Sequence, residues 1–189
     1  MIEAFLMSTG IVALAEMGDK TQLLALVLAA RFRKPVPIIL GILVATLLNH
    51  GVAGALGAWL MQWVGPQVMR WILGVSFLAM AGWILIPDKL DDTQAVKKGG
   101  VFLTTLIAFF LAEMGDKTQF ATVALAAQYS SLVAVVIGTT FGMMLANVPA
   151  VLLGERVTRI VPMRTVHLIA AGLFVVLGLM ALFNVGGVL

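Results

Sequence analysis

Residues 14–22 read Leu-Ala-Glu-Met-Gly-Asp-Lys-Thr-Gln, and the same nine residues recur unchanged at 111–119. At this offset of 97 residues the match continues weakly, since residues 28–30 and 125–127 both read Leu-Ala-Ala. The repeat predicts two related units, residues 1–86 and 101–189, joined by a polar linker at 87–100. Internal duplication of this kind is typical of secondary transporters, although repeats also occur in proteins that transport nothing.

The composition around the repeat is that of a protein in lipid. Hydrophobic residues make up 61% of the 189 residues and charged residues 11%, with a mean hydropathy of +1.08. Soluble domains are about 45–50% apolar and roughly 25% charged. The sequence therefore predicts an integral membrane protein, with the lipid bilayer as a partner and no nucleic acid, because a net charge of +3 is small. With no cysteine, disulfides and thiolate metal sites are excluded.

Six apolar stretches are each near or above the roughly 20 residues that cross a bilayer. They lie near 4–30, 37–61, 68–86, 101–127, 131–154 and 166–186. The predicted fold is all-α, with six transmembrane helices arranged as two three-helix repeats. Because three is odd, the second repeat enters the membrane from the opposite side, which gives an inverted repeat with its substrate site at the repeat interface.

The basic residues predict the orientation of these spans. Nine of the twelve follow spans one, three or five, on one side of the predicted membrane: Arg31, Arg33, Lys34, Lys89, Lys97, Lys98, Arg156, Arg159 and Arg164. The opposite side holds only Arg70, at the start of span three, and the remaining two, Lys20 and Lys117, lie inside spans one and four. The positive-inside rule therefore places both termini away from the cytoplasm. The start Met1-Ile2-Glu3 has no basic region, so we expect the first span to be retained rather than cleaved.

Six charged residues violate the membrane pattern, because they lie inside spans one and four. They are Glu16, Asp19 and Lys20, with Glu113, Asp116 and Lys117. Six such charges near the bilayer centre would cost roughly 15–20 kcal/mol before pairing, a cost that packing does not require. On a helix the glutamate and aspartate of each copy share a face. Opposed across the repeat interface, the four carboxylates predict an oxygen-rich site for Mg²⁺, Ca²⁺ or Mn²⁺, or for protons when no metal is bound.

The other polar residues of these spans allow two interpretations. Neutral oxygens for an ion, or hydrogen bonds between helices, are expected of Thr21, Gln22, Thr118, Gln119, Asn49 and Asn147. Lys20 and Lys117 are expected as ion-pair partners, for example of the glutamates four residues earlier, because ammonium cannot ligate a cation. Gly18 and Gly115 either break their helices or allow close packing. His50 and His167 are expected to be packing or interface residues, and the glycines of the remaining spans are expected at close helix contacts.

The two motifs, Glu16 to Thr21 and Glu113 to Thr118, resemble the Glu-x-Gly-Asp-Lys/Arg-Ser/Thr signature of a family of small cation/proton exchangers. That family includes bacterial manganese exporters and the Golgi manganese/calcium transporters of eukaryotes. The resemblance covers the whole chain, with one motif in the first span of each half. It implies helices in inverted repeats, Mn²⁺ or Ca²⁺ as substrate, exchange for protons, and a bacterial inner-membrane location. It also implies that Glu16, Asp19, Glu113 and Asp116 form the ion site.

Three other classes of protein remain open at this point, one of them a non-transporting helical subunit whose charges pair internally for assembly. A passive divalent-cation channel would need the same carboxylates, because coupling to protons cannot be inferred from spacing. An intramembrane aspartyl hydrolase would also need two aspartates, but it has no role for the duplicated glutamates and lysines. We therefore expect a transporter rather than an enzyme, with no bound cofactor apart from the transported Mn²⁺ or Ca²⁺ and the protons.

Overall fold

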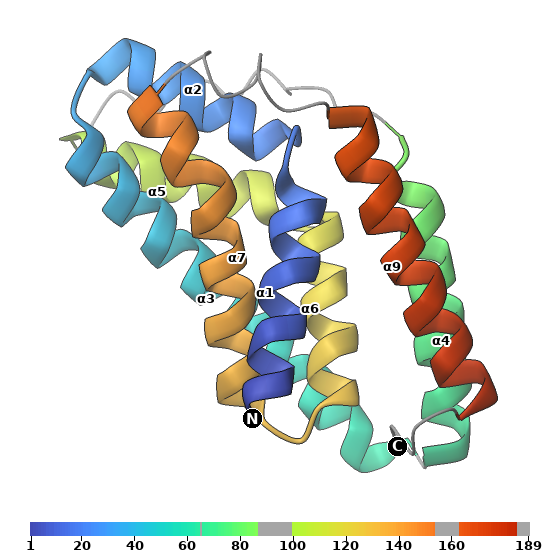
Figure 1. The fold of residues 1–189 in the computed structure, drawn as a ribbon. Helices are drawn as coiled ribbons and strands as arrows, with labels where there is room; N and C mark the ends of the chain where they lie inside the picture. The colour runs from blue at the N-terminus through green and yellow to red at the C-terminus, as the bar shows by residue number, and fades with distance from the viewer. Residues whose placement is uncertain (65, 87–99, 154–162, 185–189) are drawn as a thin grey trace.

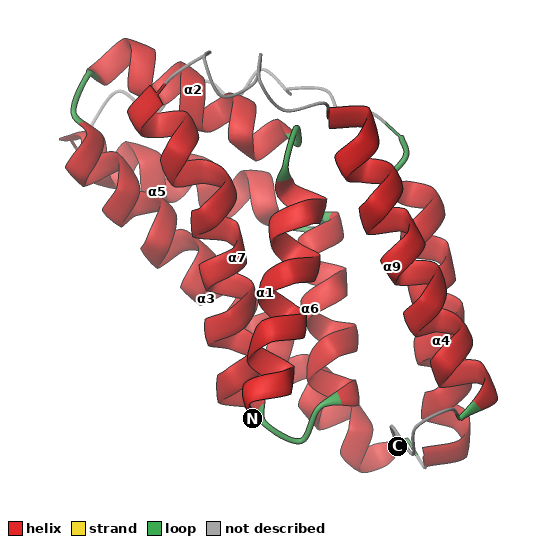
Figure 2. Cartoon of the chain, viewed as in Figure 1, coloured by secondary structure: helices red, strands yellow, loops and turns green. Residues whose placement is uncertain are grey.

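The computed structural model describes residues 1–64, 66–86, 100–153 and 163–184, and these residues are helical except for short connections (Figures 1 and 2). The helices in chain order are α1 Ile2–Glu16, α2 Lys20–Phe32, α3 Pro35–Trp63, α4 Pro66–Trp83, α5 Gly100–Glu113, α6 Lys117–Gln128, α7 Leu132–Leu153 and α9 Met163–Phe183. An all-helical fold is thus confirmed. The expected linker falls almost wholly outside the described residues.

The helices begin and end within a few residues of the predicted spans, with one difference. Spans one and four are each divided into two helices, α1 with α2 and α5 with α6. Among the described residues, three helices are long and apolar enough to cross a membrane: α3, α7 and residues 164–183 of α9. Their surfaces carry many exposed large apolar side chains, as expected where helices face lipid.

Glycine causes both divisions. Gly18 has a φ of +81° and Gly115 a φ of +76°, values that side chains rarely adopt and that glycine adopts without steric cost. The next residue, Asp19 or Asp116, is extended and forms the N-cap of the following helix. Of the two interpretations of these glycines, the helix break is therefore the correct one.

The two halves of the chain pack through helices that run side by side in the same direction. α1 lies along α7, where Gly138 admits the backbone of Phe5 and Gly142 that of Thr9. α3 lies along α5, where a Cβ on Gly41 would come within 2.8 Å of Thr105. α1 corresponds to α5, and α7 to α3, at the repeat offset. The repeat therefore relates the two contacts to each other, and each contact includes a helix that ends at a break, α1 at the first and α5 at the second.

The remaining helices, α4 and α9, form an antiparallel pair at one side (Figure 1). Gly74 packs against Leu182, and Gly178 packs against Leu78. Gly51, Gly82 and Gly172 were also predicted at close contacts, and this was wrong, because each has open space where a Cβ would be.

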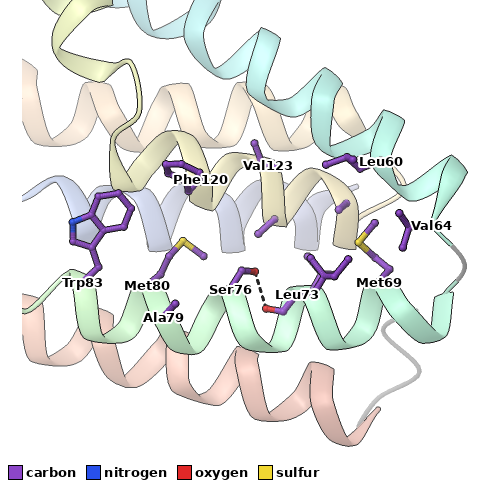
Figure 3. Close-up of a pocket in the computed structure, with 13 residues that line it drawn as sticks. Leu60, Val64, Met69, Leu73, Ser76, Ala79, Met80, Trp83, Phe120 and Val123 are labelled. Atoms are coloured by element: carbon purple, nitrogen blue, oxygen red, sulfur yellow. Dashed lines mark hydrogen bonds between the residues drawn. The ribbon is translucent and has the colours of Figure 1, made fainter.

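An apolar cavity of about 310 Å³ separates α4 from α6 and the end of α3 (Figure 3). Its lining includes Met69, Met80, Trp83 and Phe120, and Ser76 is its one hydroxyl residue. The Ser76 hydroxyl donates to the Leu73 carbonyl, 2.9 Å away, within α4. The described residues of its lining include no carboxylate, so they do not supply the ligands expected of the ion site.

Candidate metal centre

The two helix breaks bring the acidic residues of both motifs together. Glu16, Asp19, Glu113 and Asp116 are all at most 3% exposed, although they are 97 residues apart in sequence between the copies. One carboxylate oxygen from each of Glu16, Asp19 and Asp116 lies within 4.8 Å of the other two. Two oxygens bound to one Ca²⁺ at about 2.3–2.6 Å are at most about 5 Å apart, so this spacing suits a single cation.

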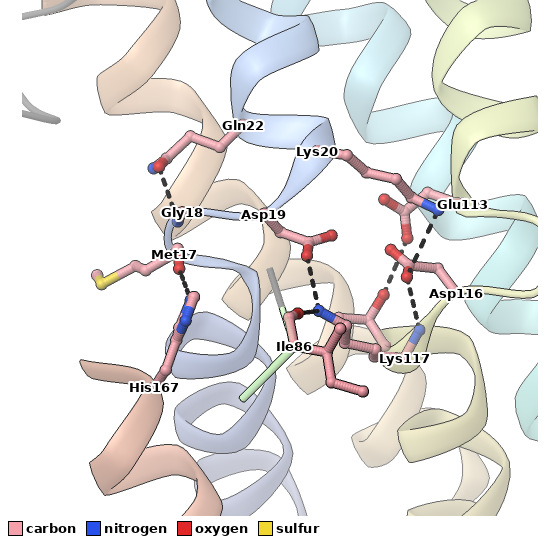
Figure 4. Close-up of polar contacts among 11 residues, drawn as sticks. Met17, Gly18, Asp19, Lys20, Gln22, Ile86, Glu113, Asp116, Lys117 and His167 are labelled. Atoms are coloured by element: carbon pink, nitrogen blue, oxygen red, sulfur yellow. Dashed lines mark hydrogen bonds and ion pairs between the residues drawn. The ribbon is translucent and has the colours of Figure 1, made fainter. Parts of the chain in front are cut away.

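The lysines pair across the two halves. Lys117 Nζ lies 3.1 Å from Asp19 Oδ1, and Lys20 Nζ lies 3.6 Å from Asp116 Oδ1 (Figure 4). Ion pairing was expected, but the suggested partners, the glutamates four residues earlier, were wrong. The helix break is the reason, because the i to i+4 relation holds only along a continuous helix.

The glutamine of each motif accepts a hydrogen bond from the glycine amide at the break. Gln22 Oε1 accepts from the Gly18 amide at 2.9 Å, and Gln119 Oε1 accepts from the Gly115 amide at 2.8 Å. These amides have no partner inside a helix, so a side-chain oxygen satisfies them. The same glutamines reach the other half, where Gln22 Nε2 donates to the Ala146 carbonyl at 3.0 Å and Gln119 Nε2 to Asn49 Oδ1 at 3.5 Å.

The remaining candidates lie near the carboxylates. Asn147 Nδ2 donates to Glu16 Oε1 at 3.3 Å, and the Thr118 hydroxyl donates to Glu113 Oε2 at 2.9 Å. Thr21 is fully buried beside Lys20. Asn49 donates to the Phe110 carbonyl at 3.1 Å. Asn147, Thr118 and Asn49 therefore make hydrogen bonds, one of the two interpretations, whereas the Thr21 hydroxyl has no hydrogen-bond partner among the described residues.

One contact at the site could not be inferred from the sequence. His167 of α9 hydrogen-bonds through Nε2 to the carbonyl of Met17, at the first break (Figure 4). This contact ties the α4–α9 pair to the motif. A lone histidine near the start of a span carries no spacing signal, so only the packing of α9 beside α1 reveals it.

The donor set and the charge define what the site could hold. Four carboxylates and two ammonium groups leave a formal charge of −2, which one divalent cation balances. Carboxylates, amides and hydroxyls supply oxygen, the ligand that hard divalent ions prefer. A divalent cation buried in a low dielectric needs carboxylates to balance its charge, because an unpaired buried charge is costly.

Comparison with known proteins agrees with this donor set. The family model described as "Divalent cation/proton antiporter GDT1" matches residues 4–92 and 101–187. A Vibrio cholerae protein named "Putative manganese exporter" is 52% identical over 91% of this chain and 86% of its own length. The yeast "Divalent cation/proton antiporter GDT1" is 22% identical over 97% of this chain and 84% of its own. An Arabidopsis thaliana "GDT1-like protein 5" is 25% identical over 97% of both chains. No solved structure matches the chain.

The family model covers both halves, including both complete copies of the acidic motif. Together with the 52% identical relative, this coverage identifies the protein as a transporter and not an enzyme. The chain belongs to the GDT1 family of divalent cation/proton antiporters.

Proposed function

We propose that this protein exports Mn²⁺, with Ca²⁺ as a second substrate, across the bacterial inner membrane in exchange for protons. The observation that carries the proposal is the cluster of Glu16, Asp19 and Asp116 oxygens within 4.8 Å, drawn from both motifs. Manganese is preferred because the 52% identical Vibrio cholerae relative is named for it. Oxygen ligands alone accept both ions.

The exchange follows from the charge of the site. A divalent cation bound among the four carboxylates neutralises the formal charge of −2. When the ion leaves, protons that bind to carboxylates restore that neutrality, since like charges in a low dielectric favour the protonated form. Metal and protons therefore compete for the same oxygens, and we expect the apparent affinity for Mn²⁺ to fall as the pH falls.

We propose further that the chain crosses the membrane six times, as an inverted repeat of units 1–86 and 101–189 joined by the cytoplasmic linker 87–100. The parallel contacts α1–α7 and α3–α5 and the antiparallel pair α4–α9 support this arrangement. They are the relations expected when one three-span unit is inverted relative to the other. The basic residues of the loops support termini on the periplasmic side.

The site residues in this proposal fall into two groups. Glu16, Asp19, Glu113 and Asp116 bind the ion or protons. Supporting hydrogen bonds come from Asn49, Asn147, Thr118, Gln22 and Gln119, and ion pairs from Lys20 and Lys117. Thr21 joins the first group as a neutral oxygen donor for the ion. The family excludes the aspartyl hydrolase. The ion pairs of both aspartates with lysines also differ from a dyad of two aspartates that share one proton.

Purified protein in proteoliposomes tests the exchange directly. Mn²⁺ or Ca²⁺ is added outside vesicles that contain a pH dye, and metal uptake and internal pH are recorded together. We expect metal entry to drive protons out, and an imposed proton gradient to drive metal against its own gradient. Metal flux with no opposing proton movement would identify a passive channel and contradict the proposal.

A further inference from the structure

His50 is a fully buried side chain in the middle of α3 that the proposed exchange does not use. Within the described part of the chain, neither of its ring nitrogens has a hydrogen-bond partner. A buried polar group without a partner is costly and needs a physical explanation, such as an ion or a water molecule that completes its bonding. An imidazole is also a common metal ligand through either nitrogen.

The repeat offset relates His50 to Asn147, which is the residue that contacts a glutamate of the site. Asn147 of α7 donates to Glu16 of α1 at 3.3 Å. At the offset of 97 residues, Asn147 corresponds to His50 of α3 and Glu16 corresponds to Glu113 of α5. The equivalent pair in the other half is therefore His50 with Glu113. At equivalent positions, one half therefore has an imidazole, that of His50, and the other has an amide, that of Asn147.

Independent contacts support this correspondence at the same place. The Gln22 side chain donates to residue 146, and its counterpart Gln119 donates to residue 49, the counterpart of 146. Asn49, next to His50, also donates to the Phe110 carbonyl, three residues before Glu113. α3 at residues 49–50 therefore lies beside the end of α5, where Glu113 has one carboxylate oxygen, Oε1, without a partner among the described residues.

We propose that His50 and Glu113 form a second ion position, with one nitrogen and one oxygen donor, and that this imidazole makes the transporter prefer Mn²⁺ over Ca²⁺. The proposal rests on the proposed function, because it assumes that the site carries divalent ions. Ca²⁺ takes oxygen ligands almost exclusively, so a nitrogen donor costs it coordination that a transition metal keeps. The equivalent position at Glu16 and Asn147 offers only amide and carboxylate groups and does not discriminate in this way.

Pulsed electron paramagnetic resonance on bound Mn²⁺ tests the ligand without any transport. The protein, purified through a histidine-free tag, is loaded with Mn²⁺ and examined for modulation of the spin echo by a coordinated ¹⁴N nucleus. The chain has two histidines, so His167→Asn is the matched control. We expect the nitrogen modulation in the wild type and in His167→Asn, and its loss in His50→Asn and His50→Gln. A wild type that binds Mn²⁺ without nitrogen modulation would overturn the proposal.

Selectivity tests the consequence for transport. Flux of Mn²⁺ and of Ca²⁺ is measured for the wild type, His50→Asn and His50→Gln in proteoliposomes. We expect the ratio of kcat/KM for Mn²⁺ to that for Ca²⁺ to fall by about tenfold or more in both variants, the scale of losing one metal interaction. An equal loss of both fluxes would mean that His50 only supports packing. If the wild type fails to exchange metal for protons, the proposed function fails instead, and the two failures are thereby distinguished.

Discussion

Each motif lysine neutralises the aspartate of the other motif, so the two halves are joined by charge as well as by packing. The two pairs differ in their surroundings. The side chain of Lys117 is 6% exposed and that of Lys20 is 24% exposed, at distances of 3.1 and 3.6 Å from their aspartates. A divalent cation that binds Asp19 or Asp116 has to compete with an ammonium group, and the more exposed and longer pair is the weaker competitor.

The aspartates give the first prediction at the scale of single residues. Asp19→Asn or Asp116→Asn removes one negative charge and one ligand oxygen from the site, while an asparagine can still cap the following helix. We expect Mn²⁺ flux to fall by more than about tenfold in each variant, with normal expression and membrane insertion. Reconstituted flux and the amount of protein in the membrane fraction are the measurements.

Glu3→Gln is the control for this pair, because Glu3 is an exposed acid in the first turn of the same α1 that carries Glu16. It removes the same charge without touching the cluster, and its flux should equal that of the wild type. Wild-type activity in either aspartate variant would show that the cluster is not the ion site.

At the scale of helices, the motif contains the parts that its own break requires. The glycine supplies the positive φ, the aspartate forms the N-cap, and the glutamine satisfies the exposed amide. Asp116 also accepts from the Lys117 amide at 2.8 Å, as a capping carboxylate does. Each of these parts lies within the motif, and both copies of the motif form the same break.

The contact between α3 and α6 gives a prediction at this scale. A Cβ on Gly57 would collide with the backbone carbonyl group of Val123 on α6. Backbone cannot rotate away, so Gly57→Ala should separate the two helices and cost about 1–3 kcal/mol. We expect a lower melting temperature in detergent and reduced flux, because α6 begins at the second break.

Gly51→Ala is the matched control on the same helix. Gly51 has open space where the Cβ would be, and alanine is a better helix former than glycine by about 1 kcal/mol. Its melting temperature should equal or exceed that of the wild type. A similar loss in both variants would mean that α3 is sensitive to any added methyl group, rather than to the approach of α6.

At the scale of the whole molecule, the helices divide into a site-bearing group and a side pair. α1, α2, α3, α5, α6 and α7 surround the carboxylates, while α4 and α9 pack mainly on each other (Figure 1). The side pair contacts the rest through α1 and α6. The hydrogen bond from His167 to Met17 and the apolar cavity beside α4 both lie between the two groups. The candidate ion site meets this pair at two points: His167 of α9 contacts the first break, and Lys117 Nζ donates to the carbonyl of Ile86, just after α4, at 3.5 Å (Figure 4).

The proposed topology gives a prediction at this scale, and the absence of cysteine makes it simple to test. Lys34 and Ser130 are both exposed and are separated by three proposed crossings. In intact cells we expect a membrane-impermeant maleimide to label Ser130→Cys but not Lys34→Cys, which should react only after the cells are opened. The unmodified protein supplies the background, since it has no thiol.

Labelling of both cysteines from the same side would contradict an odd number of crossings between them, and with it the inverted repeat. Labelling of Lys34→Cys alone from outside would keep the six crossings but reverse the orientation inferred from the basic loops.

The sequence by itself determined the membrane environment, the positions of the helices and the residues that approach one another at the candidate site. These depend on local properties, since apolar length predicts a span and a duplicated acidic motif inside one predicts a site. It left open whether Gly18 and Gly115 break their helices, because a small residue also serves close packing. It also suggested the wrong partners for Lys20 and Lys117, because the i to i+4 relation assumes an unbroken helix.

Only the tertiary structure decided these points. Each lysine pairs with an aspartate in the other half of the chain. That pairing depends on how α1 packs on α7 and α3 on α5. Glycines at the contacts permit this packing, but the spacing of residues in the sequence does not encode it. Likewise, only the packed molecule shows that the buried His50 has no hydrogen-bond partner among the described residues and that His167 contacts the first break. Contacts between distant segments depend on the complementary shape of whole helix faces, and no single motif contains that information.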